Sequence, residues 1–318
     1  MTVRLGLLST ARINDQILRG SAETEAVEVV AVGSRDGARA EAYARERGLA
    51  RAHGSYESLL ADPALDAVYV ALPNALHAEW AVRALEAGKH VLVEKPFSAR
   101  PDAVESAFDV AGRHGLVLAE AFMYRHHPQT ARVAELVRGG AIGRLRSIQA
   151  RFAFRLTDPA NIRAARDLGG GALLDLGSYC VSGARLLAGE PERVQAEVVP
   201  LGDVDGAFHG MLRFPGEIVA QFEASFLAPL GQRLEAAGEN GVLVVEAPWR
   251  QDWGGDVLLR RGDEVERIEI PPANAYTLEL EDFASAIRGE RAPLLGREDA
   301  LGQARTLAAL LAAAEPSL

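Results

Sequence analysis

The sequence predicts an α/β fold: a doubly wound parallel sheet, followed by an α+β domain built on a large, mostly antiparallel open sheet. Before about residue 122, short apolar runs alternate with helical patterns, and near-continuous apolar strands are typical of parallel strands covered on both faces. After it, apolar and polar residues alternate between Gly, Pro and Asp turns, which indicates antiparallel strands with one covered face. We therefore expect domains at residues 1–122 and 123–318.

Five apolar runs in the first half are predicted strands, and patterns rich in Ala, Glu and Arg between them are predicted helices. Gly48, Gly88 and Gly115 each follow a helical pattern, where a left-handed C-terminal cap places glycine. The predicted strands are VRLGLL, VEVVAV, LDAVYVAL, HVLVEK and GLVLAEA. The predicted helices are DQILRG, DGARAEAYARERG, YESLLAD, ALHAEWAVRALEAG and PDAVESAFDVAGRHG.

The second half begins with a predicted helix over residues 128–139 and contains two more helices at its end. A Gly-rich turn leads into a long helix in GGGALLDLGSYCVSGARLLAG, and the closing helices are LELEDFASAIRG and REDALGQARTLAALLAAA. The predicted strands are RSIQARFAFRL, RVQAEVVPL, AFHGMLRF, EIVAQFEASFL, RLEAAG, GVLVVEA and DVLLRR with VERIEI. One face of this sheet has no predicted helical cover, which favours self-association as a homodimer, with a tetramer left open.

Composition excludes several classes of protein. The chain of 318 residues has a formal net charge of −10, which disfavours nucleic acid and anionic membranes as partners. No run approaches the roughly 18 apolar residues of a membrane span, and the first apolar run is too short for a signal peptide. The single cysteine, Cys180, excludes an internal disulfide and is expected in the core. We expect a cytoplasmic protein with a small-molecule substrate.

The stretch GLLSTARIN joins the first strand to the first helix. In a Rossmann-type dinucleotide-binding domain this turn carries G-x-G-x-x-G, and here the glycine positions are Ser9, Ala11 and Asn14. Small side chains still allow a phosphate to approach, and two hydroxyls and the helix N-terminus offer donors. On its own the stretch favours an ordinary strand–turn–helix connection. The candidate cofactor contacts are Ser9, Thr10, Ala11, Arg12 and Ile13.

The end of the second strand reads AVGSRD. NAD usually meets an acid there, on its ribose hydroxyl, whereas NADP usually meets an arginine. Ser34 and Arg35 suit a 2′-phosphate better than a free hydroxyl. Asp36 keeps NAD open, and the alternative is that Asp36 caps a solvated helix. We predict NADP, with NAD as the second choice.

Two further motifs carry a resemblance to a known family. Pro73-Asn74 with His77 precedes Glu94-Lys95-Pro96, and GGGALLDLGSYC follows 80 residues later, counted from Lys95 to Asp175. The sequence resembles the glucose–fructose oxidoreductase, inositol dehydrogenase and related (Gfo/Idh/MocA) family over essentially the whole chain. It is most similar to the branch with dimeric dihydrodiol dehydrogenases and xylose dehydrogenases. Turns poor in glycine, like STARIN, are common there, so the resemblance favours a cofactor turn.

Lys95 is the first predicted catalytic residue. It ends the HVLV strand, and ligands bind at the carboxyl ends of strands in open α/β sheets. Pro96 would hold the lysine partly desolvated, which suits acid–base or electrostatic work. The alternative is a strand-end lysine reaching into solvent, and the EKP motif favours catalysis. We also predict a cis Lys95–Pro96 bond.

Asp175 and Tyr179 are the other two predicted catalytic residues. Four residues apart on a helix, they would project from one face near its N-terminus. Tyrosine can exchange a proton when a neighbouring cation, here Lys95, makes its phenol more acidic. Many family members carry histidine at this position, whereas the dihydrodiol dehydrogenase and glucose–fructose oxidoreductase branches carry tyrosine. The alternative is a capping Asp175 and a core Tyr179 after a simple turn at residues 169–171.

The remaining candidates border the nicotinamide or the substrate. Leu72, Pro73, Asn74, His77, Glu94 and Lys95 complete the predicted cofactor contacts. Lys95, Arg125, His126 and Tyr179 are the predicted substrate contacts. The adjacent His126 and His127 do not predict a metal site, because neighbours on a strand point to opposite faces and no third ligand is apparent.

These residues predict a hydride transfer between a nicotinamide and a secondary alcohol or ketone carbon of a sugar or cyclic polyol. Tyr179 would exchange the hydroxyl proton, Lys95 would keep that phenol acidic, and Asp175 would orient the pair. Two alternatives stay open: a cofactor-sensing regulatory protein on the same fold, and a glycosidase or epimerase that uses tightly held NAD as a transient oxidant. The presence of Lys95, Asp175 and Tyr179 counts against the regulatory protein. The predicted preference for NADP, a cofactor that is released, counts against the glycosidase or epimerase.

Overall fold

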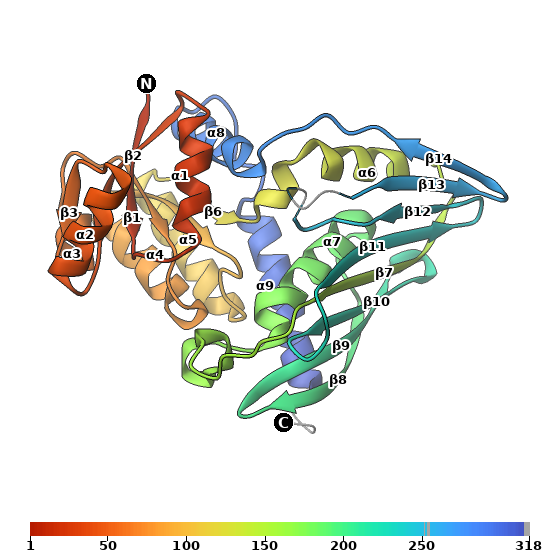
Figure 1. The fold of residues 1–318 in the computed structure, drawn as a ribbon. Coiled ribbons are helices and arrows are strands. Elements are labelled where there is room, and N and C mark those ends of the chain that lie inside the picture. The colour runs from red at the N-terminus through yellow and green to blue at the C-terminus, as the bar shows by residue number, and fades with distance from the viewer. Residues whose placement is uncertain (251, 253–254, 315–318) are drawn as a thin grey trace. The chain divides into compact units, whose positions relative to one another are not determined.

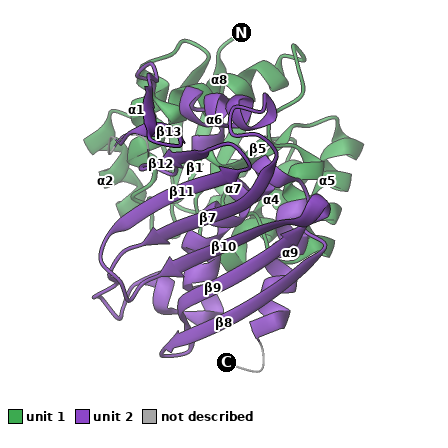
Figure 2. Cartoon of the chain, turned by 90° about the vertical axis from the view of Figure 1, so that its right-hand side faces the viewer, with its two compact units in different colours: residues 1–123, 274–301 green, residues 124–273, 302–318 purple. Residues whose placement is uncertain are grey.

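The computed structural model describes residues 1–250, 252 and 255–314, in two compact units (Figure 2). The first unit is Met1–Met123 with Asn274–Leu301, and the second is Tyr124–Ala273 with Gly302–Leu318. The expected split after residue 122 differs from this division in one respect. Residues 274–301 return to the first unit, because the helix that they contain packs against the first helix of the chain.

The first unit is a Rossmann-type domain, as predicted, and its parallel sheet has six strands, one more than the five expected (Figure 1). Its order is β3-β2-β1-β4-β5-β6, and all neighbours are parallel. The strands are β1 (Val3–Leu8), β2 (Val27–Gly33), β3 (Arg51–His53), β4 (Ala67–Val70), β5 (His90–Glu94) and β6 (Leu118–Ala121). From β1 the chain adds strands toward β3 on one side, and from β4 it adds strands toward β6 on the other. Ligands of such sheets bind at the carboxyl ends of the strands, where this order reverses, which here is between β1 and β4.

Helices complete the first unit. They are α1 (Asn14–Ala22), α2 (Gly37–Arg47), α3 (Tyr56–Leu60), the 3₁₀ turn η1 (Asn74–Leu76), α4 (His77–Glu86), α5 (Pro101–His114) and α8 (Ala275–Ile287). The predicted left-handed glycines are confirmed, with φ of 68° at Gly48, 77° at Gly88 and 65° at Gly115. The Thr277 hydroxyl donates to the carbonyl oxygen of Gly20 at 3.1 Å, which fastens α8 to α1.

The second unit contains the predicted large sheet, with eight strands in the order β14-β13-β12-β11-β7-β10-β9-β8. They are β7 (Leu145–Ala153), β8 (Arg193–Leu201), β9 (Val204–Phe214), β10 (Ile218–Ser225), β11 (Gly231–Gly238), β12 (Val242–Val245), β13 (Val257–Arg261) and β14 (Glu264–Ile268). The sheet departs from a simple meander at one place, where β7 and β10 pair in parallel. This pairing puts β7 in the interior of the sheet.

Helices cover one face of this sheet, and no helix of the described residues covers the other, which we call the bare face (Figure 2). The longer helical segments of this half are η2 (Met123–His126), α6 (Pro128–Arg138), η5 (Leu173–Gly177), α7 (Ser178–Ala188) and α9 (Arg297–Ala314), which begins in the first unit. Three short 3₁₀ turns complete the described part of it: η3 (Ile162–Ala164), η4 (Arg166–Leu168) and η6 (Pro215–Glu217). Helix α7 packs on β7 and β10. Of the helices in the described ranges, none combines the length and the apolar character that crossing a bilayer demands.

Candidate functional site

The turn after β1 is tied to the end of β4. The Ser9 hydroxyl donates to the carbonyl oxygen of Ala71 at 2.6 Å and accepts from the backbone N–H of Ala11 at 3.2 Å. Ser9 has a φ of 135°, in a region that side chains rarely adopt, at the position of the first fingerprint glycine. Its hydroxyl is therefore engaged within the protein. The other predicted contacts of the turn, Thr10, Ala11, Arg12 and Ile13, lie between β1 and α1.

The third glycine position holds a buried polar side chain. Asn14 opens α1, and its side-chain amide donates to the carbonyl oxygen of Ser9 at 2.8 Å. Among the described residues, the Oδ1 atom of Asn14 and the hydroxyl of Tyr43, which lies beside it, have no hydrogen-bond partner of good geometry. These two side chains interact with each other. The fit to a nucleotide rests on the backbone of the turn, where Ser9 has a φ of 135°, and on the N-terminus of α1.

The tip of β2 is basic. Asp36 accepts from the backbone N–H of Arg39 at 3.1 Å, so its carboxylate caps α2, which the sequence offered as the alternative. Burial raises the pKa of the Tyr56 phenol, and the nearby guanidinium groups of Arg35 and Arg39 oppose that rise. Both cations thus lie close to the end of β2, near the buried Ser34. This arrangement fits a 2′-phosphate better than a free ribose hydroxyl.

The turn after β5 carries Lys95, and its backbone is held by side chains from other segments. The Lys95–Pro96 bond is cis, as predicted. The Lys95 N–H donates to Glu94 at 3.2 Å, and the Phe97 N–H donates to Glu120 at 2.8 Å. The Tyr69 hydroxyl also donates to Glu94. The carboxylates of Glu94 and of the buried Glu120 therefore fix the backbone on both sides of Lys95.

His77 opens α4 with its ring buried, at 1% exposure. Its Nδ1 lies 2.8 Å from the carbonyl oxygen of Pro96, and its Nε2 lies 2.8 Å from that of Leu72. Burial lowers the pKa of the imidazole to about 4, although the two carbonyls, as acceptors, oppose this shift. That His77 contacts the cofactor directly remains a prediction from the sequence. The neighbouring candidates Pro73 and Asn74 lie in the loop between β4 and α4.

In the second unit, Asp175 and Tyr179 lie in two consecutive helical segments. Asp175 is in η5, a π-helical turn, and Tyr179 is in the first turn of α7. Such turns occur frequently at functional sites. Asp175 accepts from the Nε of Arg163 at 2.6 Å, in an ion pair that the sequence did not predict. Arg163 lies twelve residues earlier, in the 3₁₀ turn η3 (Ile162–Ala164), and its spacing from Asp175 did not indicate this ion pair.

The cap of this helical run is Asp205, which the sequence analysis also missed. Its carboxylate accepts from the backbone N–H of Leu173 at 2.6 Å and from that of Ala172. Burial raises the pKa of Asp205 to about 6, although these donors and Arg166 oppose the rise. Gly171 has a φ of 113°, and a Cβ there would lie 2.0 Å from Asp205 Oδ1, so glycine is required. The available signal was an acidic residue, Asp205, followed directly by the run GAF near the start of β9.

Aromatic rings surround Tyr179, which is buried on α7. Its ring centroid lies 5.8 Å from that of Tyr124, 5.5 Å from Phe152 and 6.2 Å from Trp249. Tyr124 and Arg125 both bond to the hydroxyl of Ser182, at 2.7 Å and 3.3 Å, one helical turn after Tyr179. The structure therefore brings Arg125 to the helix of Tyr179.

His126 lies with Arg125 in η2. This 3₁₀ turn replaces the strand on which the metal argument for His126 and His127 relied. The Nδ1 of His127 accepts from the backbone N–H of Gln129, which makes it the cap of α6. Cys180, next to Tyr179, is fully buried, as predicted.

Asp205 is expected to make the free energy of unfolding depend on pH. Its pKa is about 6 in the folded protein and about 3.9 in an unfolded chain. The folded state thus binds this proton more readily, and stability falls as pH rises from about 4 to about 6, then levels off. The full change is about 3 kcal/mol, measured by urea unfolding across this range.

Two variants isolate this effect. Asp205→Asn should lose this part of the pH dependence, because the amide does not titrate. Asp203→Asn, an exposed position two residues earlier, should keep it. Equal pH dependence in the Asp205→Asn variant and the wild type would show that another group is responsible.

The parallel sheet, the nucleotide turn and the held lysine define an NAD(P)-dependent oxidoreductase. Residues 5–122 match the model of an oxidoreductase family with an NAD-binding Rossmann fold, and residues 130–244 match that of the GFO/IDH/MocA C-terminal domain. The chain belongs to the Gfo/Idh/MocA oxidoreductase family, which confirms the resemblance.

Relatives span the whole chain. D-xylose 1-dehydrogenase (NADP(+)) 2 of Haloferax volcanii is 39% identical, over 98% of this chain and 97% of its own length. scyllo-Inositol 2-dehydrogenase (NADP(+)) IolU of Bacillus subtilis is 32% identical, over 90% and 88%. The crystal structure of KijD10, a 3-ketoreductase from Actinomadura kijaniata in complex with NADP and TDP-benzene, has a TM-score of 0.92 at 33% identity, covering 99% of this chain and 98% of its own.

Proposed function

We propose that the protein is a cytoplasmic, NADP-preferring dehydrogenase or reductase of a sugar or cyclic polyol. It transfers a hydride between the nicotinamide and a secondary alcohol or ketone carbon. The observation that carries the proposal is the Lys95 turn, held at the end of β5 beside the switch point of a nucleotide-binding sheet. The relatives add support, because their names specify xylose, inositol and a dTDP-sugar as substrates.

The proposed roles follow from the chemistry of each side chain. Bound NADP supplies or accepts the hydride, and residues 9–13, Ser34, Arg35 and the loop from Leu72 to Asn74 hold it. Tyr179 exchanges a proton with the reacting hydroxyl, and the Lys95 ammonium makes that phenol more acidic. Asp175, paired with Arg163, orients them, while Arg125 and His126 bind other substrate hydroxyls. The proposal requires that Lys95 and Tyr179 act on the same substrate.

A spectrophotometric screen tests this function. Aldoses, inositols and cyclic diols are compared with NADP and with NAD, and NADPH formation with at least one class is expected. No turnover on the whole panel would favour the regulatory alternative. Cofactor that co-purifies with the protein, together with substrate conversion but no net NADPH, would favour the glycosidase or epimerase alternative.

Arg35→Ala is expected to weaken the use of NADP selectively. Loss of a charge-assisted hydrogen bond to the 2′-phosphate costs about 1.5–3 kcal/mol, so kcat/KM for NADP falls about 10- to 100-fold. With NAD, which lacks that phosphate, kcat/KM changes little. Arg45→Ala, at an exposed position of α2, the helix that follows Arg35, is the control. Equal losses with both cofactors would contradict the assignment.

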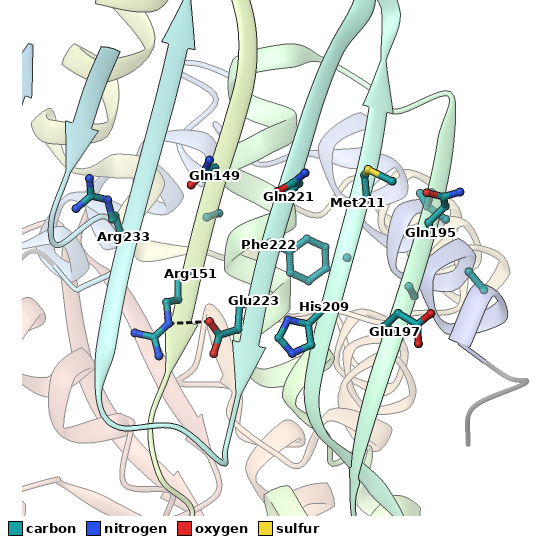
Figure 3. A pocket seen from close by; sticks show the side chains of 15 residues that line it. Gln149, Arg151, Gln195, Glu197, His209, Met211, Gln221, Phe222, Glu223 and Arg233 are labelled. Carbon is teal, nitrogen blue, oxygen red and sulfur yellow. Dashed lines mark hydrogen bonds and ion pairs between the residues drawn. The ribbon is translucent and has the colours of Figure 1, made fainter. Parts of the chain in front are cut away.

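We also propose that the protein is a homodimer that pairs through the bare face of the eight-stranded sheet. This face has a hollow of about 840 Å³, lined by polar side chains together with apolar ones such as Met211 and Phe222 (Figure 3). One row across the sheet is basic at one end and acidic at the other. In register order it is Arg233, Arg151, Glu223, His209 and Glu197. With a two-fold axis parallel to β10, the basic end of one copy faces the acidic end of the other, so the surface is self-complementary.

Charge reversal tests this dimer. Arg233→Glu and Glu197→Arg are each expected to raise the dimer dissociation constant, because like charges then face each other across the two-fold axis. The double variant should recover dimerisation. Analytical ultracentrifugation measures the three variants and the wild type. A wild-type monomer, or single variants that dimerise normally, would sink this proposal.

A further inference from the structure

The imidazole of His77 connects two loops beyond the end of the β4–β5 ladder. That ladder ends where Val70 pairs with Val93. Leu72 follows β4 and Pro96 follows β5, so neither takes part in the pairing. The ring contacts both of their carbonyl oxygens at 2.8 Å. A rigid side chain therefore continues the connection between the two strand ends where the backbone hydrogen bonds have stopped.

Both loops belong to the candidate site. Leu72 begins the segment predicted to border the nicotinamide, and Pro96 is bonded directly to Lys95. The two N–H groups of this turn donate to Glu94 and Glu120, and the Pro96 carbonyl is the group that His77 contacts. The contact with His77 thus fixes the carbonyl group of this turn, as the two carboxylates fix its N–H groups.

We infer that His77 is a positioning residue, which ties the Lys95 turn to the Leu72 loop and so fixes where the Lys95 ammonium lies. The inference rests on the proposed function, because it matters for turnover only if Lys95 is catalytic. A buried ring whose nitrogens both lie against backbone carbonyls has no nitrogen left for a cofactor.

Two amide variants separate the contacts of the ring. The Asn amide reaches the place of Nδ1, so His77→Asn can keep the donor to Pro96. The Gln amide reaches the place of Nε2, so His77→Gln keeps the contact with Leu72 and loses the one with Pro96. Misplacing a catalytic group by about 1 Å can cost about 10²-fold in rate. We therefore expect kcat to fall about 10²-fold in His77→Gln and far less in His77→Asn, with little change in KM for NADP.

The second readout needs neither cofactor nor substrate. Hydrogen–deuterium exchange of the free protein reports the Lys95 and Phe97 amides, which donate to Glu94 and Glu120. These amides are expected to exchange faster in His77→Gln and at nearly the wild-type rate in His77→Asn. His90→Asn is the control: it lies at the other end of β5 and keeps an acceptor for the Val117 N–H. It should match the wild type in both measurements.

The outcomes are distinguishable. Equal losses in the Asn and Gln variants, unchanged exchange in His77→Gln, or a loss confined to KM for NADP would each overturn the inference. If His77→Gln does not fold, His77→Asn with an undiminished kcat and normal exchange still supports the inference, and a severe loss of kcat contradicts it. Normal turnover in Lys95→Met would instead refute the proposed function. An inactive Lys95→Met beside a fully active His77→Gln would refute the inference alone.

Discussion

Replacing Lys95 by Cys is expected to lower turnover by about 10²–10⁴-fold, and aminoethylation of the new thiol is expected to restore a large part of it. The thioether formed with an aminoethyl group is nearly as long as lysine and carries the same ammonium. Rescue would therefore show that the positive charge at this position, rather than the fold of the turn, supports the reaction. Steady-state kinetics before and after alkylation measures the effect.

The chain suits this experiment. Cys180 is its one native cysteine and is fully buried, and burial raises the pKa of its thiol, so alkylation is confined to residue 95. Lys89 is the only other lysine, and its ammonium donates to the carbonyl oxygens of Asp62 and Leu65 at 2.7 Å and 2.9 Å. Lys89→Met should lower stability and leave kcat nearly unchanged. Near-normal turnover of unmodified Lys95→Cys would remove the basis of the proposed mechanism.

Tyr179→Phe is expected to lower kcat by about 10²–10⁴-fold and to leave stability nearly unchanged. The phenylalanine keeps the packing against Tyr124, Phe152 and Trp249, and loses only the hydroxyl that exchanges the proton. The prediction is checked by steady-state kinetics together with thermal unfolding.

Tyr124→Phe is the matched control for this variant. It removes a neighbouring phenol whose hydroxyl donates to Ser182, which costs about 1 kcal/mol of stability. Its kcat should stay close to that of the wild type. If Tyr124→Phe lost as much turnover as Tyr179→Phe, the assignment of the proton to residue 179 would fail.

Much of the fold could be predicted because its strands carry local patterns. Parallel strands such as β4 are buried on both faces and therefore appear as apolar runs. Strand β3 escaped prediction, because Arg51–His53 has three residues and no apolar run. The parallel pairing of β7 with β10 and the return of α8 to the first unit also escaped. Both features depend on contacts between segments that are distant in the sequence. The periodicity of apolar residues predicts single helices and strands and does not predict such contacts.

The site shows the same division. Short motifs pointed to Lys95, Asp175 and Tyr179, because a motif places chemistry at fixed spacing. The residues that hold these groups, Arg163 and Asp205, come from loops or strands with no spacing signal. His77 was assigned to the cofactor from its place after a strand, and its link to Pro96 is visible only once two strand ends lie side by side.

The attachment of α8 to α1 has a consequence for the order in which the protein can be completed during synthesis. The ribosome makes the first 123 residues early, but residues 274–301 of the same unit leave it only after the whole eight-stranded sheet has been translated. Until then, the nascent chain exposes the surface of α1 around Gly20 that Tyr276 and Thr277 later cover. The nucleotide-binding half is thus begun first and finished nearly last.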